Sequence, residues 1–156
     1  MKILILYYSR TGNTKNIAEL LKERLDADCE RIEDKKNRKG IIGYLKSGAD
    51  ALMSHTTNLK PVNSKPEDYD LVLIGSPVWA SNLPPPIRTL LIDKGKDFDK
   101  TAYFCTCGSS IGKTADQIES LLDAELAEVL QIVDDEISSK KLNEKVDNFI
   151  EKLLES

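Results

Sequence analysis

Apolar residues in this chain fall into short, nearly continuous runs separated by longer stretches of mixed character. Residues 2–8 form the first run, which is typical of a strand that is covered on both faces. Similar runs predict strands over residues 69–75, 102–106 and 129–133, and a weak alternation over residues 28–33 predicts a short second strand.

Apolar residues three or four positions apart predict a helix after each strand. These helices are expected from about residue 14, over residues 40–54, from about residue 84, near residues 115–122 and over residues 142–153. Alternating strands and helices imply an α/β fold, in which a parallel sheet carries helices on both faces and the crossovers are right-handed. The chain is expected to form a single domain over residues 1–156.

One connection is longer than a compact domain usually needs, because residues 34–66 separate the second strand from the third. Such a segment is often functional. His55 follows the helix predicted inside it and is expected to be a surface or capping residue. On one stripe of that helix lie Ile41, Leu45, Ala49 and Leu52.

Composition and charge exclude several classes of protein. The net charge is −4 and no basic stripe is present, so nucleic acid is not an expected partner. No apolar run approaches the roughly 20 residues of a membrane span, and the apolar start is too short for a signal sequence. Three cysteines do not make a disulfide framework, which favours a reducing, cytoplasmic location.

The chemistry of such a sheet is expected at the carboxyl ends of its strands, where ligands of doubly wound folds bind. Polar, glycine-bearing loops follow the first, third and fourth predicted strands. The first loop lies between a buried strand and a helix, so its backbone amides have no intrahelical partners and face outward with the positive end of the helix dipole. These groups predict a phosphate site. The loop consists of Ser9, Arg10, Thr11, Gly12, Asn13 and Thr14.

Two features of this loop narrow its chemistry. Gly12 allows a tight turn without a Cβ clash. The Gly-Lys-Ser/Thr ending of a nucleotide-hydrolysing phosphate loop is missing, so hydrolysis of a nucleotide is not expected.

Residues 8–14, with the sequence Tyr-Ser-Arg-Thr-Gly-Asn-Thr, resemble the phosphate loop of the flavodoxin family. The resemblance extends over the whole chain, and it implies a five-stranded sheet of order 2-1-3-4-5 with FMN as the cofactor. Residues 69–80 are similar to the third strand of the family and its flavin-stacking loop, which places the single tryptophan against the flavin. In that loop the resemblance assigns Pro77, Val78, Trp79 and Ala80 to cofactor binding.

The third loop, after the fourth strand, is expected to wrap the pyrimidine side of the flavin through its backbone. Gly108 and Gly112 would permit that close approach. Cys105 and Cys107 are expected to be buried thiols on opposite faces of the strand, and not a metal or redox pair. The cofactor-binding residues predicted here are Thr106, Cys107, Gly108 and Ser109.

Two departures from the family pattern affect the predicted flavin end of the site. The third loop has no aromatic residue to cover the second face of the flavin, so that face is expected to be open to a hydride donor or a small acceptor unless residues 40–58 or a second subunit cover it. Ala80 replaces the glycine that flavodoxins often have after the stacking tryptophan, and alanine makes a positive φ costlier by roughly 1 kcal/mol or more.

The predicted function is electron transfer through bound FMN. The protein is either a carrier that serves a redox partner protein or a reductase that uses NAD(P)H to reduce quinones or similar small acceptors, and the two departures favour the reductase slightly. One alternative is a flavin-free or flavin-sensing interaction module on the same fold, and a weaker one is a protein that binds another phosphate. A monomer and a homodimer remain equally open.

Overall fold

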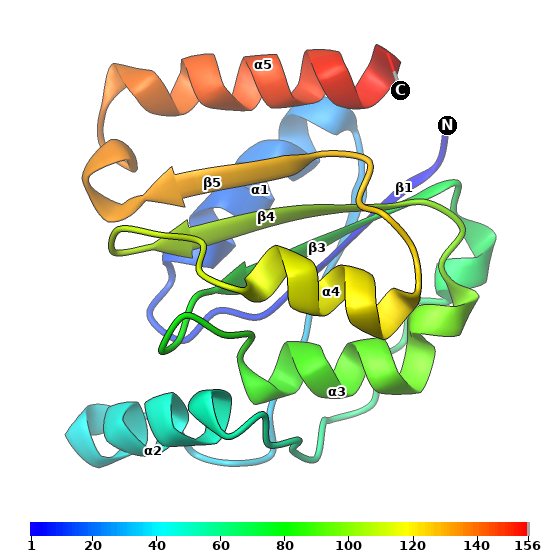
Figure 1. Ribbon diagram of the computed structural model, residues 1–156. Helices are drawn as coiled ribbons and strands as arrows, with labels where there is room; N and C mark the ends of the chain where they lie inside the picture. Colours follow the sequence, from blue (N-terminus) through cyan, green and yellow to red (C-terminus); the bar gives the residue numbers. More distant parts are fainter. Residues whose placement is uncertain (156) are drawn as a thin grey trace.

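The computed structural model describes residues 1–155, in which five strands alternate with five helices (Figure 1). The strands are β1 (Ile3–Tyr7), β2 (Asp28–Arg31), β3 (Leu71–Pro77), β4 (Thr101–Cys107) and β5 (Val129–Val133). The helices are α1 (Asn13–Leu25), α2 (Gly40–Leu52), α3 (Pro85–Lys94), α4 (Thr114–Leu122) and α5 (Lys140–Glu155). Short 3-10 turns lie at Pro66–Asp68, Gly95–Asp97 and Asp134–Glu136.

All neighbouring strands are parallel, and their order is β2-β1-β3-β4-β5. This confirms the predicted fold class and strand order. β1 is an interior strand between β2 and β3, and its Leu6 is in register with Glu30 of β2 and Ile74 of β3. Because β1 has neighbours on both edges and helices over both faces, all five of its residues are buried.

The side chains of the sheet divide into two cores, one under each layer of helices. Alternate residues of β1 point to opposite faces, so Ile5 joins the core formed with α1 and α5, and Leu6 joins the core formed with α3 and α4. Figure 1 shows this arrangement, with α1 and α5 on one side of the sheet and α3 and α4 on the other.

The helix α2 forms where the sequence predicts it, but its orientation is unexpected. The predicted apolar stripe is not packed into either core and remains largely exposed, with Ile41 79% and Leu45 66% exposed. The buried side consists of small and polar residues, among them Gly43 and Ser47. A Cβ at Gly43 would lie 2.4 Å from the backbone of Arg38, so only a glycine lets the helix pack this closely on the preceding turn.

The two cysteines of β4 are buried, as expected, but the prediction that they face opposite sides of the strand is wrong. Side chains two residues apart in a strand point to the same face. Cys105 and Cys107 accordingly interact, and burial together with the neighbouring thiol raises the pKa of Cys105 to about 12. Both thiols remain protonated at neutral pH, which agrees with inert, structural cysteines.

Membrane-spanning helices and metal-binding clusters are both absent from residues 1–155. Along residues 1–155, no helix combines the length and the apolar character that crossing a bilayer requires. The same residues contain no cluster of three or more His, Cys, Asp or Glu side chains suited to a metal ion.

The packing of Gly75 against the Phe104 ring can be tested by its effect on stability. A Cβ at Gly75 of β3 would lie 2.1 Å from the Phe104 ring, so Gly75→Ala should lower the free energy of unfolding by about 1–3 kcal/mol through overpacking. Gly48→Ala is the matched control, because a Cβ there meets nothing within 4 Å on a helix, and it should stabilise the protein by up to about 1 kcal/mol. Urea unfolding of both variants measures the difference, and equal effects would contradict this packing.

Candidate functional site

Three loops project from the carboxyl edge of the sheet, on the left in Figure 1. They follow β1, β3 and β4, which are adjacent in the sheet, so the three predicted segments come together. Residues 11, 80–81 and 108–110 are exposed at their tips. We call them the first, second and third loops.

The first loop has the geometry of an anion site. Gly12 has a φ of 106° and precedes the first residue of α1, and none of the described side chains caps this helix. Ser9 is buried, and its hydroxyl accepts a hydrogen bond from the Gly12 amide at 3.1 Å, so it braces the turn from inside. The uncapped helix start and the left-handed glycine fit the phosphate of FMN.

A buried contact joins the first loop to the third. The hydroxyls of Thr14 and Thr106 lie 2.8 Å apart, and both side chains are almost fully buried. The second loop meets the same point, because the Val78 amide donates to the Thr106 carbonyl at 3.2 Å. The positions of the three loops are therefore coupled.

The second loop holds two consecutive residues in a left-handed conformation. Ala80 has a φ of 48° and Ser81 a φ of 62°, which costs roughly 1–2 kcal/mol for each residue other than glycine. Asn82 holds the turn, because its side-chain amide donates to the Ala80 carbonyl at 2.6 Å and its oxygen accepts from Gln117 of α4 at 2.6 Å. Strain of this kind is found at functional sites, where the surroundings enforce it.

The third loop packs its backbone against the second. A Cβ at Gly112 would lie 2.5 Å from the Ser81 carbonyl oxygen, and the Lys113 amide donates to that same oxygen at 2.7 Å. The expectation that Gly112 admits the flavin is therefore not supported, because its close neighbour is Ser81. Gly108 is exposed with open space around it and remains free to approach a ligand.

Trp79 is buried to 9% exposure at the base of the second loop. The edge of Tyr8 packs on it with ring centroids 5.5 Å apart, and the Arg38 guanidinium lies 5.6 Å from the indole centroid. Burial raises the pKa of Tyr8 to about 12, so its ring stays neutral beside the indole. Arg38 is a contact of Trp79 that the sequence does not reveal.

A charged cluster holds Arg38 in this position. Arg38 is 5% exposed and pairs with Asp34 at 2.6 Å and with Asp50 of α2 at 2.9 Å. Burial favours the neutral form of Asp50, but hydrogen bonds from His55 and Arg38 outweigh it, so the pKa of Asp50 lies below its ordinary value. His55 itself is half-exposed, as expected of a surface residue, and lies 3.1 Å from Asp50.

An apolar cleft of about 310 Å³ separates α2 from the second loop. Tyr44, Leu45 and Leu52 line one side of it, and Trp79 and Ala80 line the other. The Arg10 guanidinium of the first loop lies 5.1 Å from the centroid of the Tyr44 ring, a distance at which a cation is attracted to an aromatic face. Through this contact α2 also reaches the first loop.

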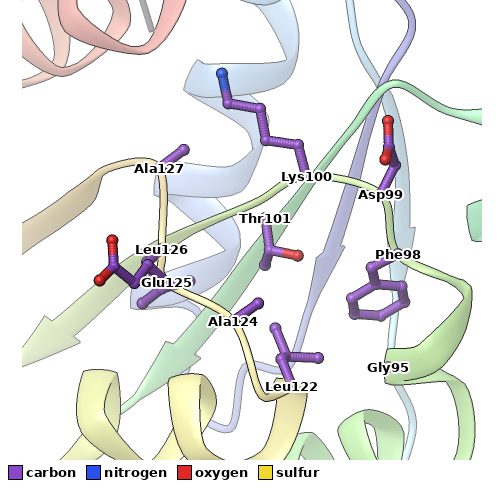
Figure 2. A pocket seen from close by; sticks show the side chains of 10 residues that line it. All are labelled: Gly95, Phe98, Asp99, Lys100, Thr101, Leu122, Ala124, Glu125, Leu126 and Ala127. Atoms are coloured by element: carbon purple, nitrogen blue, oxygen red, sulfur yellow. The ribbon is translucent and has the colours of Figure 1, made fainter.

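A second cavity, of about 420 Å³, lies at the opposite edge of the sheet. Figure 2 shows Phe98, Thr101 and Leu122 around it. Thr101 begins β4, so this cavity opens at the amino ends of the strands, far from the three loops. Because ligands of doubly wound folds bind at the carboxyl ends, we do not assign the flavin to it.

Comparisons with known proteins agree with this geometry. A family model described as flavodoxin matches residues 2–149. The chain belongs to the flavodoxin family. This membership confirms the family resemblance seen in the sequence and supports FMN as the cofactor.

Solved structures extend the comparison. A flavoprotein from Lactobacillus acidophilus, crystallised in complex with FMN, has 27% sequence identity and a TM-score of 0.72, covering 90% of this chain and 98% of its own. The apo form of the flavoprotein from that organism has 28% identity and a TM-score of 0.65, covering 88% and 95%. A protein from Bacteroides eggerthii shares the fold at 24% identity, with a TM-score of 0.77 and coverage of 96% and 98%. No curated protein matches the sequence significantly.

The charged cluster around Arg38 predicts a defined dependence on pH. Asp50→Asn should lower the free energy of unfolding at pH 7 by about 3 kcal/mol, the lower end of the range for a broken buried ion pair, because Asp34 still pairs with Arg38. Since the pKa of Asp50 is lowered in the folded protein, its contribution is complete above pH about 4 and is lost as the pH falls through the folded pKa.

Urea unfolding between pH 3 and pH 7 tests this dependence. The stability curves of the wild type and the Asp50→Asn variant should converge toward low pH. Asp68→Asn is the control on an exposed turn and should change stability by less than about 0.5 kcal/mol. A parallel offset between wild type and Asp50→Asn at every pH would contradict the role of the Asp50 charge.

If the first loop holds the FMN phosphate, a substitution at Gly12 should abolish FMN binding. Gly12→Asp places a carboxylate beside the phosphate site and a side chain at a φ of 106°, so we expect FMN affinity to fall below detection. Gly40→Asp is the matched control, because Gly40 also has a positive φ, of 75°, with open space around it, and it lies outside the loop. FMN titration followed by flavin fluorescence, on variants with native circular dichroism, makes the comparison. Wild-type affinity in Gly12→Asp would show that the phosphate binds elsewhere.

Proposed function

We propose that this protein is an FMN-dependent reductase that transfers electrons from NAD(P)H to a quinone or a similar small, flat acceptor. The balanced reaction takes one NAD(P)H, one proton and one quinone to NAD(P)⁺ and the hydroquinone. The observation that carries this proposal is the apolar cleft between α2 and the second loop.

The flavin end of the proposal is supported by the three loops. The first loop offers the helix start at Gly12, the second offers the part of Trp79 that lines the cleft, and the third offers the exposed residues Gly108 and Ser109. The family and the FMN-bound Lactobacillus relative support this cofactor. FMN would supply the redox chemistry, and the residues of the chain would bind it and shield it from water.

The acceptor end is supported by the shape and chemistry of the cleft. A volume of about 310 Å³ is at the lower end of the range for small-molecule sites, about 300–1,000 Å³. Tyr44 and Leu45 offer apolar surface, and Trp79 forms a wall that the cleft shares with the proposed flavin site. A flat aromatic acceptor placed there would lie close to the flavin without a partner protein.

A second candidate function is a carrier that docks a redox protein. It is favoured by the exposed apolar face of α2, where Ile41, Ile42 and Leu52 are between 66% and 83% exposed. An apolar patch on a monomer often marks a protein interface. The two functions differ in which residues of α2 they use, because Leu45 lines the cleft and Ile42 does not.

Steady-state kinetics of the FMN-loaded protein separates the two functions. The assay uses NADPH or NADH with a small benzoquinone. Leu45→Asp should raise the KM for the quinone by about tenfold, because it removes a small apolar contact from the cleft and adds a charge there. Ile42→Asp is the matched control on the same helix and should leave this KM unchanged. Wild-type protein that oxidises neither nucleotide in the presence of quinone would contradict the reductase.

A further inference from the structure

A basic pocket lies beside the first loop, between the ends of β1 and β2. It measures about 300 Å³, and seven of its thirteen lining residues are Lys or Arg, whereas two are acidic. This is a strong local contrast in a protein of net charge −4. A concave surface lined by charges of one sign concentrates ligands of the opposite sign.

The acidic residues do not neutralise this pocket. Glu33 pairs with Lys60 at 3.0 Å, and Asp34 pairs with Arg38 at 2.6 Å. The other cations include Arg10, Arg31, Lys35 and Lys39, and none of these four has a carboxylate partner within residues 1–155. Their charge is therefore available to a ligand.

Two guanidinium groups give the pocket a fixed frame. Arg38 is 95% buried, and its Nη2 has no hydrogen-bond partner among the residues that the structure describes. Arg31 donates from Nη2 to the Ser9 carbonyl at 2.7 Å, which ties the pocket wall to the start of the first loop. Planar guanidinium groups match the geometry of phosphate oxygens.

We propose that this pocket binds a phosphate or pyrophosphate group of a small molecule other than FMN. The pocket shares Ser9 and Arg10 with the first loop, but it does not include residues 11–14 at and just before the start of α1, so it adjoins the proposed FMN phosphate site without containing its helix start. The inference rests on the proposed function only in assigning the FMN phosphate to the first loop.

The phosphate or pyrophosphate group could belong to a phosphorylated dinucleotide or to another phosphorylated metabolite, and the experiment below distinguishes the two sources.

Calorimetric titration of FMN-loaded protein with inorganic pyrophosphate at low ionic strength tests this proposal. Lys35→Gln/Lys39→Gln removes two exposed charges that make no ion pair, and it should raise the dissociation constant by about tenfold, as expected for two screened charge contacts. The control is Lys22→Gln/Lys152→Gln, which removes two exposed helix charges outside the pocket and should bind pyrophosphate as the wild type does.

Three results would overturn the proposal. The first is equal affinity for pyrophosphate in the Lys35→Gln/Lys39→Gln variant and the wild type, and the second is no binding to the wild type at millimolar concentration. The third is release of FMN by pyrophosphate, seen as a rise in free-flavin fluorescence, because the anion would then occupy the first loop. If the protein holds no FMN, the proposed function fails, and the same titration of flavin-free variants still tests the pocket.

The source of the phosphate is identified by titration with NADP⁺ and NAD⁺. Tighter binding of NADP⁺ in the wild type, lost in Lys35→Gln/Lys39→Gln, would support the proposal and identify the ligand as a 2′-phosphorylated dinucleotide. Equal binding of the two dinucleotides, with pyrophosphate binding still sensitive to the variant, would support the proposal for another phosphorylated molecule.

Discussion

The position of β3 between β1 and β4 is the constraint on which the rest of the site depends. In a parallel sheet, adjacent strands deliver their following loops to the same edge, so this order places three distant segments side by side. The hydroxyls of Thr14 and Thr106 then meet at 2.8 Å, and the Val78 amide reaches the Thr106 carbonyl. The buried sheet thus fixes the spacing between Gly12 of the first loop and Trp79, which are more than 60 residues apart in sequence.

The sheet does not position α2, and charged contacts hold this helix instead. α2 lies outside the two helical layers and buries its small and polar side, so apolar packing alone does not hold it. Arg38 binds Asp50 of α2 and also lies on the face of Trp79, and Arg10 of the first loop lies over Tyr44. These contacts place an apolar helix face next to the second loop and leave a cleft between them.

Local sequence signals predict the fold and the tight turn at Gly12 well. The apolar runs define strands because burial on both faces demands them, and Gly12 adopts the left-handed conformation that its place between strand and helix suggests. The sequence could not show which face of α2 is buried, because the close packing of Gly43 on the Arg38 backbone, which leaves no room for a Cβ, depends on a turn that periodicity does not encode. The contact of Arg38 with Trp79 was missed for the same reason, since it joins residues that only the tertiary structure brings together. The sequence predicts that Gly112 permits a close approach to the flavin, whereas the structure places Ser81 beside it, because a glycine signals close approach without identifying the partner.

The central claim is that one FMN spans the three loops with its phosphate at Gly12 and its ring at Trp79. Two-dimensional ¹H–¹⁵N NMR spectra, recorded while FMN is added to flavin-free protein, test this claim most directly. We expect the largest shifts at the amides of Thr11, Gly12 and Asn13, at the indole N–H of Trp79 and at the amide of Gly108, all with one dissociation constant. Shifts confined to Thr101 and Ala127, at the cavity on the opposite edge, would contradict the account.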